Sequence, residues 1–249
     1  MGITITGASA GIGEALARNL HGQGARVVLA ARRRERLESL AKELAGSIVV
    51  EGDVSIPADC ARIAAAGERL DVLVCNAGYG LAKSIEETTG GDWLDLLRTN
   101  LLGTTECIRS AVPRLRAQEL RDGWRGHIVI VSSALARRGR PDGGAYSATK
   151  AAQLSVAEAL RVELAAERIA VTSVHPVGTE TEFVQAARGT WTTGAKEPRQ
   201  TATHVAKRIA GAIARPCPEV WPHRLSRWGL SLATIWPSLL DGYFRRRRA

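Results

Sequence analysis

The chain has 249 residues, of which 45% are hydrophobic and 24% charged, and it carries a formal net charge of +9. These proportions are ordinary for a globular protein, and the length suffices for one sizeable core, so we expect a single domain over residues 1–249. The basic balance would suit nucleic acid, a membrane surface or an anionic ligand. Only 4% of the residues are aromatic, and no zinc-finger or RNA-binding motif is present, so nucleic acid is not favoured.

The cysteines, at positions 60, 75, 107 and 217, are widely spaced and include no CxxC pair. This spacing argues against a zinc site and a disulfide framework, and the scattered histidines suggest no other metal. No stretch reaches the roughly 18 apolar residues of a membrane span, and a glycine-rich turn at residue 7 begins too early for a signal peptide. The sequence therefore predicts a cytoplasmic protein without a metal site.

Residues 2–6 read as a first strand, and the glycine-rich sequence GASAGIG follows before a helix over residues 14–22. The glycine pattern alone is a weak signal. Its position between a strand and a helix strengthens it, because backbone N–H groups at a helix N-terminus can bind a pyrophosphate.

A second, continuously apolar strand over residues 25–32 ends in a cluster of arginines. Dinucleotide sites that use the ribose 2′-hydroxyl place an acidic residue here, and this chain has Arg32 and Arg33 instead. Guanidinium groups bind phosphate through paired hydrogen bonds, although some of these arginines also begin the next helix, expected over residues 33–44. The cluster favours NADP(H) over NAD(H).

Further strands are expected over residues 47–51, 71–75, 127–131 and 169–176, and further helices over 59–66, 92–116 and from Ala145 onward. Strands that alternate with helices predict an α/β fold: a single-domain, Rossmann-like, doubly wound parallel sheet with helices on both faces. In such a fold the ligand lies beyond the carboxyl ends of the strands, where the unusual polar and glycine residues of this chain gather.

The stretch over residues 132–150 carries a second pattern, with Tyr146 and Lys150 spaced four residues apart on a predicted helix. The two side chains therefore share one helix face, and an ammonium beside a phenol favours the phenolate. A tyrosine tuned in this way can exchange a proton near neutral pH. Taken alone, YxxxK is common on solvated helix faces.

Five motifs, in this order and spacing, resemble the short-chain dehydrogenase/reductase family over residues 2–183: TGASAGIG at residues 6–13, NAG at 76–78, Asn100, Ser133 and YSATK at 146–150. The resemblance implies that Tyr146 acts as general acid or base and that Ser133 binds the substrate oxygen. It also implies that Lys150 holds the nicotinamide ribose and lowers the tyrosine pKa, and that Asn100 anchors a water in the proton relay.

The cofactor contacts expected from the resemblance and the charge pattern are Gly7, Ser9, Gly11, Ile12, Gly13, Arg32, Arg33, Asp53, Val54, Asn76, Ala77, Gly78, Tyr146, Lys150, Pro176, Gly178, Thr179 and Thr181. The chain departs from the family pattern at Cys75, where a second Asn is usual, and at Val177, where a Gly is usual.

Substrate-contacting parts are expected in three places. Arg137, Arg138 and Arg140 either attract an anionic substrate or form a solvated rim. Residues 183–199, with Phe183 and Trp191, are expected to form a lid over the substrate. The apolar and basic segment 220–249 either packs on its own domain or a second subunit, or contacts a membrane peripherally.

The leading interpretation is an NADP(H)-dependent oxidoreductase that acts on a small carbonyl or alcohol as a homodimer or homotetramer. One alternative is a non-catalytic regulator that binds NADP(H), for which a proton relay would serve no purpose. Another is a basic membrane- or nucleic-acid-binding protein on the same fold.

Overall fold

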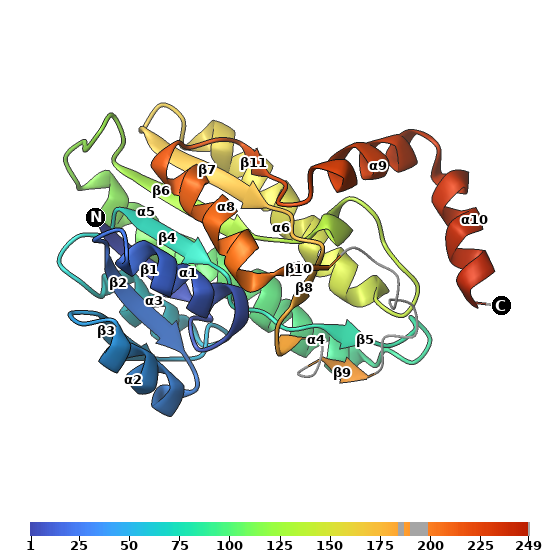
Figure 1. The fold of residues 1–249 in the computed structure, drawn as a ribbon, viewed down its shortest axis with the longest axis horizontal. Coiled ribbons are helices and arrows are strands. Elements are labelled where there is room, and N and C mark those ends of the chain that lie inside the picture. The colour runs from blue at the N-terminus through green and yellow to red at the C-terminus, as the bar shows by residue number, and fades with distance from the viewer. Residues whose placement is uncertain (184–186, 190–198, 249) are drawn as a thin grey trace.

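The computed structural model describes residues 1–183, 187–189 and 199–248, which form a central parallel sheet with helices on both sides (Figure 1). The seven strands lie in the order β11-β7-β6-β4-β1-β2-β3, and every neighbouring pair is parallel. Their bounds are β1 Gly2–Thr6, β2 Arg26–Ala31, β3 Ile48–Glu51, β4 Val72–Cys75, β6 Gly126–Val131, β7 Ile169–Val174 and β11 Glu219–Val220. The prediction of a doubly wound α/β fold is confirmed.

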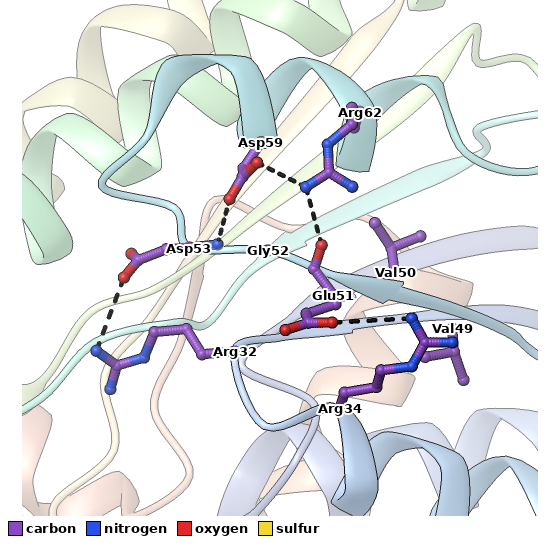
Figure 2. Close-up of a pocket in the computed structure, with 9 residues that line it drawn as sticks. All are labelled: Arg32, Arg34, Val49, Val50, Glu51, Gly52, Asp53, Asp59 and Arg62. Carbon is purple, nitrogen blue, oxygen red and sulfur yellow. Dashed lines mark hydrogen bonds and ion pairs between the residues drawn. The ribbon is translucent and has the colours of Figure 1, made fainter.

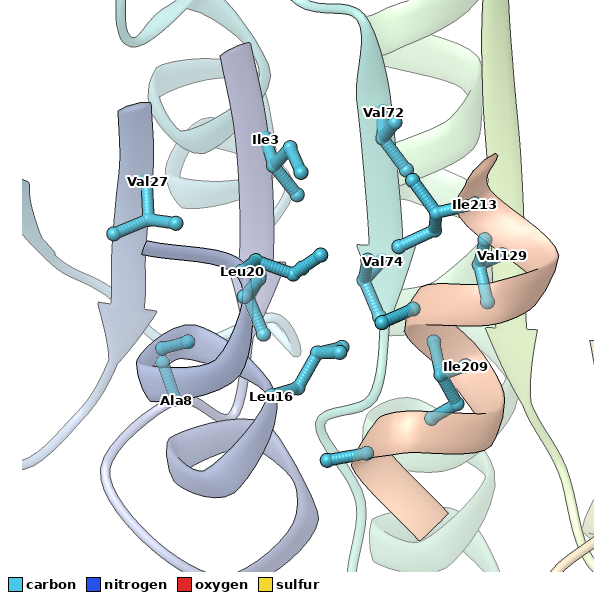
Figure 3. Packing of buried hydrophobic residues seen from close by; sticks show 14 of the residues in the cluster. Ile3, Ala8, Leu16, Leu20, Val27, Val72, Val74, Val129, Ile209 and Ile213 are labelled. Atoms are coloured by element: carbon cyan, nitrogen blue, oxygen red, sulfur yellow. The ribbon is translucent and has the colours of Figure 1, made fainter. Parts of the chain in front are cut away.

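Two apolar layers separate the sheet from its helices. On one face, α1 (Gly11–His21), α2 (Arg34–Glu43) and α8 (Ala202–Ala214) pack against the strands. On the other lie α3 (Pro57–Ala65), α5 (Gly103–Arg116) and α6 (Gly144–Glu163). Figure 3 shows the first layer, where side chains of α1 and α8 meet over β1 and β4. Residues of one strand alternate between the layers, so a continuously apolar strand has no solvated face.

The order of the strands places the first glycine loop at the middle of the sheet. Strand β1 lies between β4 and β2, and the chain leaves it in one direction toward β2 and β3 and later returns to β4 on the other side. Such a reversal opens a crevice beyond the carboxyl ends of the strands. The loops after β1, β2, β4 and β6 all emerge at this edge.

One predicted helix is interrupted. The expected helix over residues 92–116 is α4 (Gly90–Leu97), a π-helical turn at Arg98–Leu102 and α5. Within the turn, the carbonyl of Asn100 accepts hydrogen bonds from the side chains of Thr104 and Gln153. Side-chain donors that enter the helical hydrogen-bond ladder distort it, and apolar periodicity gives no sign of this.

Strand β11 was not expected from the sequence, because two residues carry no periodicity. It extends the sheet through the amide of His175, which donates to the Val220 carbonyl at 2.8 Å. Two further ladders, β8 (Gly178–Glu180) with β10 (Arg199–Thr201) and β5 (Leu81–Ala82) with β9 (Arg188–Gly189), lie outside the main sheet.

After β11 the chain forms α9 (Arg224–Ile235) and α10 (Pro237–Arg248), which project from the rest of the domain in Figure 1. Within residues 1–183, 187–189 and 199–248, no helix combines the length and hydropathy needed to cross a bilayer.

We expect Leu16→Ala to lower the free energy of unfolding by about 2–5 kcal/mol, because the Leu16 side chain is fully buried between α1 and the sheet. Urea denaturation at fixed protein concentration measures the loss. The matched control is Leu94→Ala on α4, whose side chain is 55% exposed and should cost less than about 0.5 kcal/mol. Equal losses in the two variants would contradict this assignment of the core.

Candidate active site

A cavity of about 920 Å³ opens at the carboxyl ends of the strands. The predicted site residues that line it are Gly7, Ser9, Gly11, Ile12, Arg32, Arg33, Asp53, Val54, Asn76, Ala77, Gly78, Ser133, Tyr146, Lys150, Pro176, Gly178, Thr179 and Thr181. Two predicted residues, Gly13 and Asn100, are buried and do not line the cavity. The fold therefore brings the separate motifs of the sequence to one place.

The glycine loop between β1 and α1 needs its glycines for conformation and for space. Gly7 and Gly11 have φ values of 67° and 60°, which residues with a Cβ rarely adopt. A Cβ on Gly13 would lie 2.4 Å from the carbonyl oxygen of Gly7, so Gly13 supports the loop from behind. Helix α1 starts after Ala10, whose side chain cannot cap it. The helix N-terminus thus faces the cavity without a capping side chain, which fits a dinucleotide pyrophosphate.

The NAG turn after β4 is tied to the same loop. The hydroxyl of Thr6 accepts hydrogen bonds from the amides of Asn76 and Ala77, each at 3.0 Å. The Asn76 side-chain amide donates to the Thr6 carbonyl at 3.0 Å. These bonds fix the floor of the cavity where the two loops meet.

At the other end of the cavity, α6 presents Tyr146 and Lys150 on one face, and the Lys150 Nζ lies 5.7 Å from the tyrosine ring centroid. The Tyr146 hydroxyl is hydrogen-bonded to Ser133, which follows β6. Phe183 packs against the Tyr146 ring with a centroid distance of 5.6 Å. The hydroxyl groups of Ser133 and Tyr146 therefore meet at one point of the cavity, beside the apolar ring of Phe183.

Burial, more than neighbouring charge, sets the protonation of this pair. It raises the pKa of Tyr146 above its ordinary value, and the hydrogen bond with Ser133 opposes this shift only in part. Burial also lowers the pKa of Lys150 to about 7. The expected depression of the tyrosine pKa by Lys150 is therefore not found in this structure, because both side chains are desolvated together.

Gln153 is a site residue that the sequence analysis missed. It lies on α6 one turn after Lys150, accepts a hydrogen bond from the Lys150 Nζ at 2.9 Å, and donates to the Asn100 carbonyl at 2.6 Å. The Asn100 side-chain amide bonds the Tyr79 carbonyl and the Thr149 hydroxyl. The Gln153 side chain thus links the Lys150 amine to the Asn100 carbonyl, while the water expected at Asn100 stays a prediction. The only sign of this role of Gln153 in the sequence is its position three residues after Lys150.

His175 is a second missed residue, and it supports the Ser133 backbone. Its Nδ1 lies 3.2 Å from the Ser133 carbonyl oxygen, and burial lowers the pKa of His175 to about 4. A neutral ring can donate from Nδ1 to this carbonyl while Nε2 accepts from the Ser173 hydroxyl at 3.1 Å. The ring stacks on Trp221 at a centroid distance of 4.5 Å. Trp221 directly follows β11, a strand that sequence periodicity does not reveal.

The arginines after β2 lie at the far end of the cavity. The Arg33 guanidinium donates to the Ser9 hydroxyl at 3.0 and 3.2 Å and pairs with Glu182 at 3.2 Å. Arg32 is 74% exposed and lies 3.8 Å from the Asp53 carboxylate. Both guanidinium groups border the cavity with ordinary carboxylate partners that a phosphate could replace.

A neighbouring pocket of about 630 Å³ shares Arg32 and Asp53 with the main cavity (Figure 2). In it, Arg34 lies 3.8 Å from Glu51, and Arg62 pairs with Asp59 at 2.6 Å. Each arginine has a carboxylate partner there, so the charge of this pocket is compensated.

The three arginines between Ser133 and Tyr146 have different surroundings. Arg137 pairs with Glu219 at 2.6 Å, and Arg138 pairs with Asp241 of α10. Arg140 is buried and lines the cavity. The prediction of a lid over residues 183–199 falls largely on residues 184–186 and 190–198, including Trp191, which lie outside the described residues.

A family model described as short chain dehydrogenase matches residues 2–191. The chain belongs to the short-chain dehydrogenase family. It is an oxidoreductase by family, and it is 31% identical over 188 residues to an uncharacterized oxidoreductase of Staphylococcus aureus strain MW2. That match covers 73% of this chain and 79% of the relative.

Solved structures of the family have the same fold. A short-chain dehydrogenase from Sphingobium yanoikuyae in complex with NADPH is 26% identical, with a TM-score of 0.80 over 96% of this chain and 95% of that one. A short chain dehydrogenase/reductase from Burkholderia phymatum in complex with NAD is 24% identical, with a TM-score of 0.84 over 96% and 94%. The related folds thus include complexes with each nicotinamide dinucleotide.

We expect the Lys150 amine to titrate near pH 7, neutral above and charged below, while ordinary lysines titrate near pH ~10.4. In ¹³Cε-lysine NMR of the five lysines, one resonance should shift near neutral pH and be absent from Lys150→Arg. Gln153→Leu removes an acceptor of the ammonium and should lower this pKa further. Titration of all five resonances near pH ~10 would contradict the assignment.

Proposed function

We propose that this oxidoreductase transfers a hydride between NADP(H) and a carbonyl or secondary alcohol, with Tyr146 as the general acid and base. One observation carries the proposal: the converging hydroxyl groups of Ser133 and Tyr146 share a cavity with the uncapped N-terminus of α1 and the guanidinium groups of Arg32 and Arg33. The two hydroxyl groups can hydrogen-bond a reacting oxygen. The helix N-terminus and the guanidinium groups can bind the phosphates of a dinucleotide.

The residues of the chain would divide the chemistry as follows. A bound nicotinamide supplies or accepts the hydride. During reduction, Ser133 and Tyr146 donate hydrogen bonds to the carbonyl oxygen as negative charge develops on it, and Tyr146 gives this oxygen its proton. In oxidation, the phenolate form of Tyr146 takes the hydroxyl proton. A phenol whose pKa is raised by burial is protonated at neutral pH, which is the state that reduction requires.

Lys150, held by Gln153, would keep the phenol in place and exchange protons behind it. The Lys150 amine is held by the Val131 carbonyl at 2.9 Å and by Gln153, so it stays beneath the Tyr146 ring. An amine with a pKa of about 7 gains and loses a proton readily at neutral pH. The hydrogen bond from Gln153 to the Asn100 carbonyl fixes the Gln153 side chain and so supports this position of the amine.

The preference for NADP(H) is proposed from charge. A 2′-phosphate adds negative charge beside Arg32 and Arg33, where NAD(H) has only a hydroxyl. Homo-oligomer formation and cytoplasmic location stay predictions from the sequence.

We expect Tyr146→Phe to reduce the rate of NADPH oxidation with a carbonyl substrate by about 100- to 10,000-fold, because the proton donor is lost. The affinity for NADPH, measured by fluorescence titration of the same protein, should change little. A variant that keeps its rate on every carbonyl tested would refute the role of Tyr146. Binding of NADPH without turnover by the wild type would favour the regulator interpretation instead.

We expect Arg32→Ala/Arg33→Ala to weaken NADPH binding by about 10- to 100-fold, which is the loss of charge-assisted hydrogen bonds to one phosphate. Binding of NADH should change by less than about threefold under the same titration. The matched control is Arg26→Ala, an exposed arginine at the opposite end of β2 that pairs with Glu68. Equal loss for both nucleotides would argue that the arginines hold the loop and do not read the 2′-phosphate.

A further inference from the structure

Helix α9 has two different faces. On the inner face, Ser226, Gly229 and Leu230 line the active-site cavity, and Ala233 is buried. The outer side chains of α9 are exposed to the following fractions: Leu225 74%, Trp228 71%, Leu232 50% and Ile235 65%; Trp236, directly after the helix, is 56% exposed. Their spacing of three and four residues gathers them in a stripe roughly 100° wide. A contiguous exposed stripe that includes two tryptophans marks an interaction surface.

The surroundings of this stripe are basic. Arg224 and Arg227 are exposed on α9, and Arg245 and Arg246 are exposed on α10. The sequence continues with Arg247 and Arg248, and Asp241 is the only acidic residue between positions 221 and 249. Asp241 is paired with Arg138 of the active-site loop, so its charge is compensated. The surface is therefore complementary to a partner with an apolar interior and an anionic boundary.

We propose that the outer face of α9 docks on an anionic phospholipid membrane, and that the substrate is a lipophilic carbonyl or alcohol taken from that membrane. Tryptophan and leucine on one helix face with arginine beside them suit the bilayer interface, and each arginine near an anionic surface adds to binding. A second copy of this chain fits less well. A two-fold contact brings the same patch of both copies together, so the arginines would face arginines.

The substrate class follows from the position of the cavity, and this part rests on the proposed function. The lining of the cavity includes Leu230 of α9 and Leu240 and Phe244 of α10, so the helix that carries the docking face also borders the cavity. Arg138 ties α10 to the loop before Tyr146, with its Nη2 also 3.5 Å from the Pro237 carbonyl. A molecule dissolved in the bilayer would thus meet an apolar path toward Ser133 and Tyr146.

The first experiment is flotation of the full chain with vesicles of phosphatidylcholine alone or with 30% phosphatidylglycerol. We expect binding to the anionic vesicles, weakened by 0.5 M salt, and at least a tenfold loss in Leu225→Ser/Trp228→Ser/Leu232→Ser. Arg224→Gln/Arg227→Gln should lower binding severalfold. The matched control is Val162→Ser, an apolar side chain that is 79% exposed on α6 and should leave binding unchanged.

Three results would overturn the docking proposal: no binding to anionic vesicles, equal binding to neutral ones, or the same loss in Val162→Ser. Sedimentation velocity without lipid tests the other occupant. If the triple serine variant alone dissociates an oligomer, a second copy covers this face and the membrane proposal fails. NADPH titration of each variant confirms that the cavity is intact.

The second experiment separates the two proposals. NADPH oxidation is followed with a short soluble ketone and with a long-chain ketone dissolved in anionic vesicles. The triple serine variant should keep its rate on the soluble ketone and lose at least tenfold on the vesicle-borne one. Equal rates on both would refute uptake from the membrane. Absence of turnover on any carbonyl by the wild type would refute the proposed function, while vesicle binding would still test the docking surface.

Discussion

The buried amine of Lys150 is the contact on which the arrangement of the active site depends. It donates to the carbonyl at the end of β6 and to Gln153 on its own helix, so it fastens α6 against the sheet. Ser133 follows β6 and Tyr146 lies one turn before Lys150, and their hydroxyl groups meet because the two elements are fastened there. A buried amine is tolerated only where acceptors satisfy it, and these acceptors define the geometry.

The cavity is polarised along its length. Its inner end is apolar and raises the pKa of the Tyr146 phenol, while its outer end carries Arg32, Arg33 and the N-terminus of α1. Glu182 lies across the outer end and pairs with Arg33 and Arg36. A phosphate bound at Arg33 would compete with this carboxylate for the guanidinium group.

The C-terminal helices border the active-site cavity and also carry exposed apolar side chains. Helix α9 lines the cavity with Ser226, Gly229 and Leu230 on one face and presents leucine, isoleucine and tryptophan on the other. Under the docking proposal, this one helix would both border the site and contact the membrane.

The sequence by itself determined the alternation of strands and helices, the glycine turn before α1, and the common face of Tyr146 and Lys150, because each depends on local periodicity or on a residue's own conformational range. It could not reveal the π turn at Asn100, the two-residue strand β11, or the bridge through Gln153, since these depend on contacts between distant segments. Nor could the sequence reveal the direction in which the pKa of Tyr146 shifts. Desolvation is a property of packing, and only the tertiary structure decided that burial raises the pKa of Tyr146 against the opposing hydrogen bond from Ser133.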